Sequence, residues 1–156
     1  MSTHSVRIAA EGDVPALVAL MTEFYAESGY PLPAAAAART FRALIADARL
    51  GHVFLMEDGG RPAGFAVLTV SFSMEYGGVR GFVDDFFVAP EFRGRGVGAA
   101  ALTEMERVSR VMGVRALLVE VGPDNERALS VYRRQGFSDT GHQLMVKPLA
   151  APVHEG

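Results

Sequence analysis

One stretch, residues 82–98, constrains the fold of this chain more than any other. It begins as an apolar strand, turns at Pro90, passes through a loop rich in glycine and arginine, and leads into a helix. The helix is expected over residues 98–112, because apolar residues recur there at helical spacing. Backbone N–H groups at such a helix start, together with the charges of Arg93 and Arg95, predict a phosphate-binding site.

Two nucleotide-binding motifs resemble this loop only in part. Gly94, Gly96 and Ala99 fit the dinucleotide fingerprint loosely, and Glu120 stands near the place of its ribose-binding acid. However, residues 89–93 separate the strand from the first glycine, and the remaining chain is too short for a further substrate domain. A dinucleotide-binding oxidoreductase is therefore kept only as a less favoured alternative. A P-loop is excluded, because no Gly-Lys-Ser/Thr sequence ends the loop.

The pattern Arg93-x-x-Gly96-x-Gly98 resembles the pyrophosphate loop of the GNAT acetyltransferases. A second segment downstream looks like that family's later helix with its tyrosine, through Asn125, Ala128, Tyr132 and Gly136-Phe137. The resemblance covers residues 6–147. It implies an α+β fold, a mixed and mostly antiparallel sheet flanked by helices in the order β-αα-βββ-α-β-α-ββ, with acetyl-CoA as the acyl donor.

Length and composition favour one ordinary globular domain. The 156 residues predict a single domain over 1–149, followed by a tail, 150–156, with no packing signal. A net charge of −3 argues against nucleic acid as a partner. The absence of cysteine excludes disulfides and a thiol nucleophile, and the scattered histidines predict no metal. No apolar run approaches about 18 residues, so no membrane association and a cytoplasmic location are expected.

Periodicity and turn signals predict the elements along the chain. Strands are expected at 6–9, 52–57 and 62–72, around Asp84, at 115–121, and as a final pair within 137–147. Helices are expected from a cap at Asp13, over 34–48 and 98–112, and from Asp124 or Asn125 to Arg134.

The family resemblance also implies where acetyl-CoA would bind. Its pantetheine would lie along Phe86, Phe87 and Val88 like an added strand, where the sheet is expected to separate. Its pyrophosphate would contact the loop formed by Arg93, Gly94, Arg95, Gly96, Val97 and Gly98. The glycines would let the backbone approach the phosphates, although a tight turn alone is the structural alternative.

Two acidic residues, Asp84 and Glu120, are candidates for the base that deprotonates an amine. Asp84 and Asp85 are adjacent and are expected on opposite faces of the strand. Asp84 would share a face with Phe86 and Val88, which favours it as the base or as the anchor for a cationic amine. Asp85 would make a structural bond on the other face, and the alternative is that both aspartates are purely structural. Glu120 is the second base candidate, and a water relay is the third possibility.

The remaining candidates concern the leaving group and the acceptor. Tyr132 looks like the family's general acid, with a core tyrosine as the alternative. Asn125 is either a cofactor contact or a helix cap. An amine-binding rim is expected from aromatic and acidic groups, namely Tyr25, Glu27 and Tyr30 with Asp84 and Asp85, bordered by residues 74–76.

The sequence thus predicts an N-acetyltransferase that uses acetyl-CoA, without a metal or a covalent enzyme intermediate. The acceptor would be a small amine or diamine, with an aminoglycoside or a peptide N-terminus as further possibilities. A non-catalytic acyl-CoA sensor is the main alternative. The family resemblance also implies a homodimer.

Overall fold

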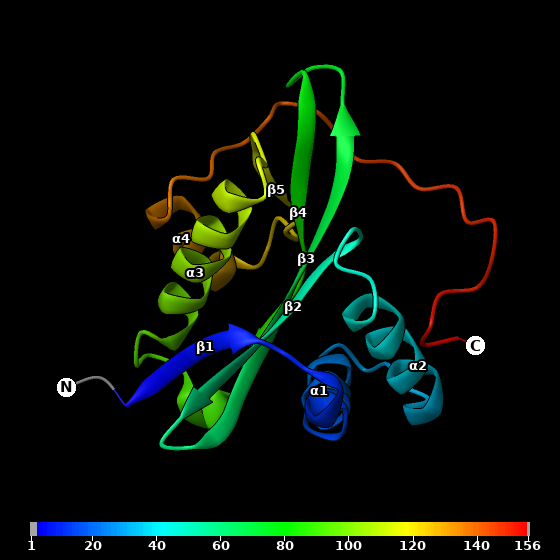
Figure 1. Ribbon diagram of the computed structural model, residues 1–156, viewed down its shortest axis with the longest axis vertical. Helices are drawn as coiled ribbons and strands as arrows, with labels where there is room; N and C mark the ends of the chain where they lie inside the picture. The colour runs from blue at the N-terminus through cyan, green and yellow to red at the C-terminus, as the bar shows by residue number, and fades with distance from the viewer. Residues whose placement is uncertain (1–2, 156) are drawn as a thin grey trace.

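The computed structural model describes residues 3–155, which form a mixed sheet with helices on both sides (Figure 1). The sheet has the strand order β1-β2-β3-β4-β5, and its members are β1 (His4–Ile8), β2 (Gly51–Asp58), β3 (Arg61–Ser73), β4 (Gly78–Val88) and β5 (Leu117–Val119). Neighbours are antiparallel except β4 and β5, which are parallel. The predicted α+β class with a mostly antiparallel sheet is confirmed.

The four α-helices divide between the two faces of the sheet. Figure 1 shows α1 (Val14–Glu27) and α2 (Ala34–Ile45) on one side, and α3 (Val97–Val111) and α4 (Glu126–Arg134) on the other. Two short 3₁₀ turns, Glu11–Asp13 and Pro90–Phe92, precede α1 and the glycine-rich loop. Among the described helices, none combines the length and the apolar content that a membrane span requires.

The core lies between these layers and follows the apolar spacing of the sequence. Leu17 of α1 and Phe65 of β3 are fully buried on one face, and Met105 of α3 is fully buried on the other. Phe24 and Phe41 pack edge-on against Phe65, with ring centroids 6.1 and 5.7 Å away. This packing holds β3 against α1 and α2, beneath the candidate site.

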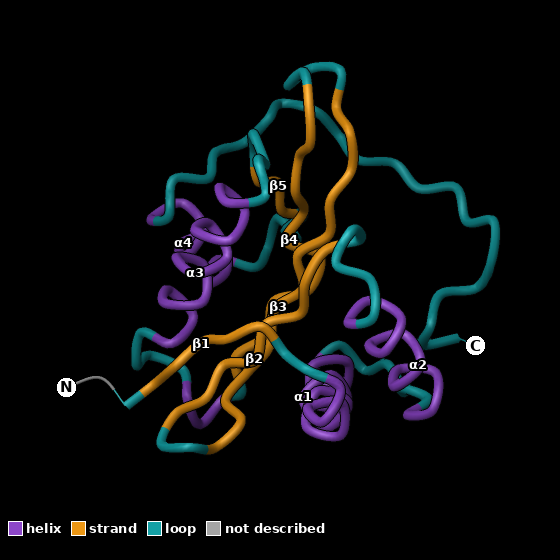
Figure 2. Tube along the Cα trace, viewed as in Figure 1, coloured by secondary structure: helices purple, strands orange, loops and turns teal. Residues whose placement is uncertain are grey.

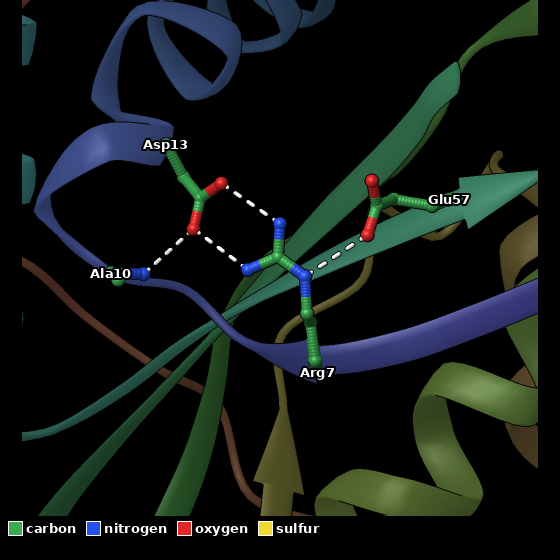
Figure 3. Close-up of polar contacts among 4 residues, drawn as sticks. All are labelled: Arg7, Ala10, Asp13 and Glu57. Atoms are coloured by element: carbon green, nitrogen blue, oxygen red, sulfur yellow. Dashed lines mark hydrogen bonds and ion pairs between the residues drawn. The ribbon is translucent and has the colours of Figure 1, made fainter. Parts of the chain in front are cut away.

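An ion-pair cluster ties β1 to the start of α1 (Figure 3). Arg7 donates from both terminal nitrogens to the carboxylate of Asp13, at 2.8 and 2.9 Å, and from Nε to Glu57 at 3.0 Å. The two bonds from Arg7 to Asp13, and one from the backbone N–H of Ala10, lower the pKa of Asp13 to about 2. Asp13 occupies the N-cap position of α1, but its side chain caps no N–H of that helix. The predicted capping bond is wrong because Arg7 and Ala10 take the carboxylate.

A bulge in β4 changes the faces expected for the two aspartates. Val67 of β3 pairs with Asp85, and the next residue, Leu68, pairs with Val83, so Asp84 is an extra residue in β4. A bulge interrupts the alternation of side chains between faces. The expectation of regular alternation through Asp84 is therefore wrong, and the strand period does not determine which face each carboxylate takes.

The C-terminal part of the chain departs most from the expected topology. Residues 137–147, predicted as a strand pair, form no strand, and Figure 2 shows them as an extended loop that leaves α4. Strands require a paired neighbour, and no backbone hydrogen bond joins these described residues to the sheet. Apolar side chains are consequently left exposed, at Leu144, Met145, Val146 and Leu149.

The end of the chain returns to α1 and α2, as Figure 1 shows. Val153 packs against the hydrophobic core, and the His154 ring lies 4.6 Å from the ring centroid of Tyr30. The segment that carried no packing signal in the sequence thus contacts the helical layer.

Two predicted elements are also shorter than expected, since α2 ends at Ile45 and β5 spans only Leu117–Val119.

Candidate active site

A groove of about 1110 Å³ opens where β4 and β5 part. Their parallel pairing ends at Val83 opposite Val119, so the rest of β4 has no neighbour on that edge. Phe86, Phe87 and Val88 line the groove along this free edge. The predicted separation of the strands is present, and it leaves backbone groups available to an extended ligand.

The glycine-rich loop closes one end of the groove at the start of α3. Gly94 and Gly96 have φ values of +77° and +85°, and Gly96 is the N-cap residue of α3. No side chain caps this helix, so the N–H groups of its first turn remain available to an anion. Val97 and Gly98 also line the groove. The loop therefore presents backbone donors where the sequence predicted a pyrophosphate site.

Arg93 and Glu27, predicted to contact different substrates, are bonded to each other. Arg93 donates from Nη2 to both carboxylate oxygens of Glu27, at 2.8 and 3.0 Å, and from Nε to the carbonyl of Val88 at 2.8 Å. Its guanidinium also lies 5.7 Å from the ring centroid of Phe87. Both charged residues line the groove. Arg93 thus joins the loop, β4 and the end of α1.

Arg95 points away from the groove. Its Nη1 lies 3.3 Å from a carboxylate oxygen of Asp58 at the end of β2, and its guanidinium lies 6.0 Å from the ring of Phe92. It is absent from the groove lining, unlike Arg93, Gly94 and Gly96. The sequence did not predict that Asp58 would lie beside the glycine-rich loop and pair with Arg95.

Asp85 is the acidic group with the most perturbed chemistry. It faces α1, lining a second cavity with Phe24 and Tyr25, and it also lines the main groove. Burial, and to a lesser extent the charge of Asp84, raises the pKa of Asp85 to about 7. Within residues 3–155 its carboxylate makes no hydrogen bond or ion pair, so the predicted structural bond is not formed. A half-ionised, unpaired carboxylate at neutral pH is suited to proton transfer.

The two bases predicted from the sequence are more exposed. Asp84 and Glu120 line the groove, Asp84 from the bulge and Glu120 from the position after β5. Both of these residues are exposed, whereas Asp85 is partly buried. The partly buried, unpaired carboxylate of the groove is therefore that of Asp85, which the sequence predicted to be structural.

Tyr132 stands across the groove on α4. Its ring is buried and packs edge-on against Phe86 and Phe137, with centroids 5.9 and 5.5 Å away. Burial, followed by the charge of Asp85, raises the pKa of Tyr132 to about 12, so the phenol keeps its proton at neutral pH. Its hydroxyl bonds to no other group in residues 3–155, and it is available as a donor within the groove.

Asn125 caps α4 and also borders the groove. Its side-chain oxygen accepts a hydrogen bond of 3.2 Å from the N–H of Ala128, so the capping role that the sequence left open is present. Arg127 and Arg134 also line the groove, and sequence reasoning missed both. They lie seven positions apart on one helix, a spacing that places them on the same side and could have indicated them.

Only part of the expected acceptor rim lines the second cavity. Tyr25, Tyr30 and Asp85 line it, whereas Glu27, Asp84 and residues 74–76 do not. His154 completes it from the C-terminal end of the chain, and nothing in the sequence pattern marked that residue. Within the described part of the chain, no group of His, Asp and Glu side chains is arranged to hold a metal ion.

Solved structures resemble the whole chain. An integron cassette protein from the mobile metagenome of Cole Harbour Salt Marsh has a TM-score of 0.89 and 51% identity, with 96% of this chain and 93% of that chain covered. The aminoglycoside N-acetyltransferase AAC(6')-Iy in complex with CoA has a TM-score of 0.82 and 20% identity, covering 96% of this chain and 97% of that one. At that identity the second likeness shows the fold alone.

Curated relatives match a part of the chain. The IAA acetyltransferase of Azospirillum brasilense is 35% identical over 81 residues, covering 52% of this chain and 53% of the relative. An uncharacterized N-acetyltransferase of Methanocaldococcus jannaschii is 32% identical over 88 residues, covering 55% of this chain and 38% of the relative. The matched regions thus span about half of these relatives or less.

The sequence model of the Acetyltransferase (GNAT) family matches residues 16–137, which include most of α1, the residues that line the groove, the glycine-rich loop and Tyr132. This match covers well over half of the chain. The chain belongs to the GNAT acetyltransferase family.

Proposed function

We propose that the protein is an N-acetyltransferase that transfers the acetyl group of acetyl-CoA to a primary amine of a small molecule by direct attack. The observation that carries this proposal is the placement of Asp85 and Tyr132 along one groove that ends at the glycine-rich loop. One group is able to accept a proton near neutral pH, and the other retains its proton. Acyl transfer to an amine needs both.

Acetyl-CoA is the co-substrate that the groove suits. An extended pantetheine chain can take hydrogen bonds from the free edge of β4 at residues 86–88. The pyrophosphate can be held by N–H groups of Gly94, Gly96 and Val97 at the start of α3. Arg127 and Arg134 add positive charge further along the groove. The CoA complex of the AAC(6')-Iy neighbour supports this choice of ligand.

Asp85 would prepare the amine for attack. An alkylammonium with a pKa near 10 is only about 0.1% neutral at pH 7, so a base must take its proton. Ionised Asp85 accepts that proton, directly or through a water, and the neutral nitrogen then forms a bond to the thioester carbon. Asp84 adds negative charge nearby, which favours binding of the cationic amine.

Tyr132 would complete the transfer. When the carbon–sulfur bond breaks, the departing thiolate takes the phenol proton. The nitrogen loses its second proton to solvent as it becomes an amide, and solvent returns a proton to the phenolate. A phenol with a raised pKa is a weak acid, but a thiol has a pKa near 8.5 and needs only modest assistance.

Replacing Tyr132 by Phe therefore tests the general acid. We expect kcat to fall about 10- to 100-fold with a small change in the KM for acetyl-CoA, because one proton donor is removed and the ring remains. Initial rates of thiol release would measure this. An unchanged kcat would make Tyr132 a core residue and would favour the non-catalytic reading of this position.

The pH dependence of the rate tests the base. We expect kcat/KM to rise as the pH increases through about 7, because the pKa of Asp85 is raised to about 7 and only its ionised form accepts a proton. Asp84→Asn removes the second cause of that raised pKa, so the rising limb should move to lower pH by about one unit or less. If the rising limb of the pH profile stays at the same pH in Asp84→Asn, the titrating group is not Asp85.

The first experiment compares the thermal stability of the protein with acetyl-CoA, NAD or no ligand. A ligand at 100 times its dissociation constant stabilises the folded state by about 2.7 kcal/mol. Stabilisation by acetyl-CoA, followed by amine-dependent thiol release, would support the enzyme. Stabilisation without release for any amine would indicate an acyl-CoA sensor, and stabilisation by NAD alone would indicate an oxidoreductase.

We propose further that the enzyme acts in the cytoplasm as a homodimer. The exposed apolar side chains of the C-terminal segment, from Leu144 to Leu149, are consistent with a surface that a second copy would cover. Measurement of the molar mass in solution tests the dimer.

A further inference from the structure

The second cavity adjoins the groove at Asp85. It has a volume of about 240 Å³ and is lined by Phe24, Tyr25, Ser28, Tyr30, Asp85 and His154. Phe24 and Asp85 also line the main groove, so the two spaces meet at the carboxylate. A molecule in the second cavity would therefore place one end beside the proposed base.

The C-terminal segment supplies one wall of this cavity. The ring of His154 lies 4.6 Å from that of Tyr30, tilted by 48°, and 5.8 Å from that of Tyr25, nearly edge-on. Val153 packs against the core and holds the segment in place. Residues 25, 30 and 154 are far apart in sequence, yet together they form three aromatic sides of one space.

The charges around the cavity limit what it can accept. Asp85 is the one acidic group among its described lining residues. The carboxylate of nearby Glu27 is bonded to Arg93, and that of Glu155 lies 3.8 Å from Nε2 of His154. One cationic nitrogen would be matched by this lining. A second ammonium group, as in a diamine, would enter an aromatic space without a lining carboxylate of its own and would lose hydration there.

The size and surface of the cavity point to the body of the acceptor. Its volume of about 240 Å³ is below the range of about 300–1,000 Å³ for drug-sized ligands, which favours a small acceptor body over an aminoglycoside. Aromatic walls favour a flat ring in edge-to-face contact, which adds to the gain from burial. The mouth at Asp85 suits the ammonium group.

We propose that the acceptor is a primary monoamine with a one-ring aromatic body. Its nitrogen lies at Asp85, and its ring lies among Tyr25, Tyr30 and His154. This inference rests on the proposed acetyltransferase function and narrows its substrate class. It also makes His154 a specificity-determining residue.

The test compares four amines as acceptors for the full-length protein. These are 2-phenylethylamine, n-butylamine, 1,4-diaminobutane and kanamycin, assayed by thiol release from acetyl-CoA. We expect kcat/KM for 2-phenylethylamine to exceed that for each of the others by at least about 10-fold. Calorimetric titration of 2-phenylethylamine and 1,4-diaminobutane should show the same order of affinity without turnover.

A variant of His154 separates the aromatic wall from the chemistry. His154→Ala should raise the KM for 2-phenylethylamine about 5- to 10-fold, and leave kcat and the parameters for n-butylamine nearly unchanged. His154→Phe should restore the KM, because it restores the ring. His142→Ala is the matched control, since its side chain is exposed in the same C-terminal segment and makes no hydrogen bond.

The outcomes distinguish this inference from the function on which it rests. Turnover of all amines at similar kcat/KM, or a preference for the diamine or kanamycin, would overturn the aromatic acceptor and leave the acetyltransferase intact. Calorimetric binding of 2-phenylethylamine that His154→Ala does not weaken would also overturn it. Loss of stabilisation by acetyl-CoA and of all turnover would instead refute the proposed function, and the inference would fall with it.

Discussion

Asp85→Asn should lower kcat/KM for a primary amine by about 100- to 1,000-fold at pH 8 and make the protein more stable there. The rate falls because an amide cannot accept the proton of the ammonium group. Stability rises because the native carboxylate is buried beside Asp84, and its pKa is raised to about 7 from an ordinary value of 3.8. The same property that suits Asp85 to proton transfer opposes folding.

The sign of the stability effect depends on pH. The unfolded chain releases the proton of Asp85 near pH 3.8, whereas the folded protein keeps it to about pH 7. The folded state therefore binds more protons between these values, and its stability falls as the pH rises through them. The full penalty, on the order of 4 kcal/mol, applies above pH 7 and is absent below pH 3.8.

Urea unfolding of the wild type and of Asp85→Asn at pH 4 and pH 8 measures this difference. The variant should be the more stable protein at pH 8, and the gap should shrink at pH 4. Asp84→Asn should gain less stability at pH 8 than Asp85→Asn, because it removes only the lesser cause of the raised pKa of Asp85. A loss of stability in Asp85→Asn at pH 8 would show that the carboxylate has a structural role after all.

Gly64→Ala should destabilise the protein by about 3 kcal/mol, which corresponds to roughly 10 °C in Tm for a chain of this length. A Cβ at this position of β3 would lie 2.3 Å from the carbonyl oxygen of Phe87 and 2.9 Å from the sulfur of Met56. The Phe87 carbonyl belongs to the backbone of β4 and cannot move without shifting that strand. Because Phe87 lines the groove, the KM for acetyl-CoA should rise as well.

Gly12→Ala is the matched control for this steric effect. A Cβ at Gly12 would meet no atom within 4 Å, and its φ is not positive. We expect its Tm to stay within about 2 °C of the wild type. Calorimetry of both variants measures the difference, and an equal Tm for Gly64→Ala and Gly12→Ala would contradict the close approach of β3 and β4.

The parts of the fold that depend on local pattern could be predicted from the sequence. The apolar spacing of α1 predicted its buried face at Val14, Leu17 and Met21, and the helix lies on the sheet as expected. The glycines before α3 predicted a helix start whose backbone N–H groups are open to an anion, and the structure has Gly94 and Gly96 at positive φ before a helix start without a side-chain cap. These features follow from short-range geometry, which the residues themselves determine.

Features that depend on distant partners could not be predicted in the same way. A bulge at Asp84 arises from the register between β3 and β4, and one extra residue there alters which carboxylate faces α1. The apolar residues of 137–147 have the composition of strands, but no strand of the sheet pairs with them. The partners of Arg93 and Arg95 come from α1 and β2, and sequence order does not reveal them.

The bond between Arg93 and Glu27 makes the two halves of the site mechanically dependent. The guanidinium of Arg93 bonds both to Glu27 at the end of α1 and to the carbonyl of Val88 at the edge of β4. The end of α1 leads into Ser28 and Tyr30, which line the second cavity. A ligand that displaces Arg93 from Glu27 will also shift its contact with Val88, and the reverse holds as well. Saturation with one substrate should thus alter the apparent affinity for its co-substrate. The order in which the two substrates bind would then depend on this single side chain.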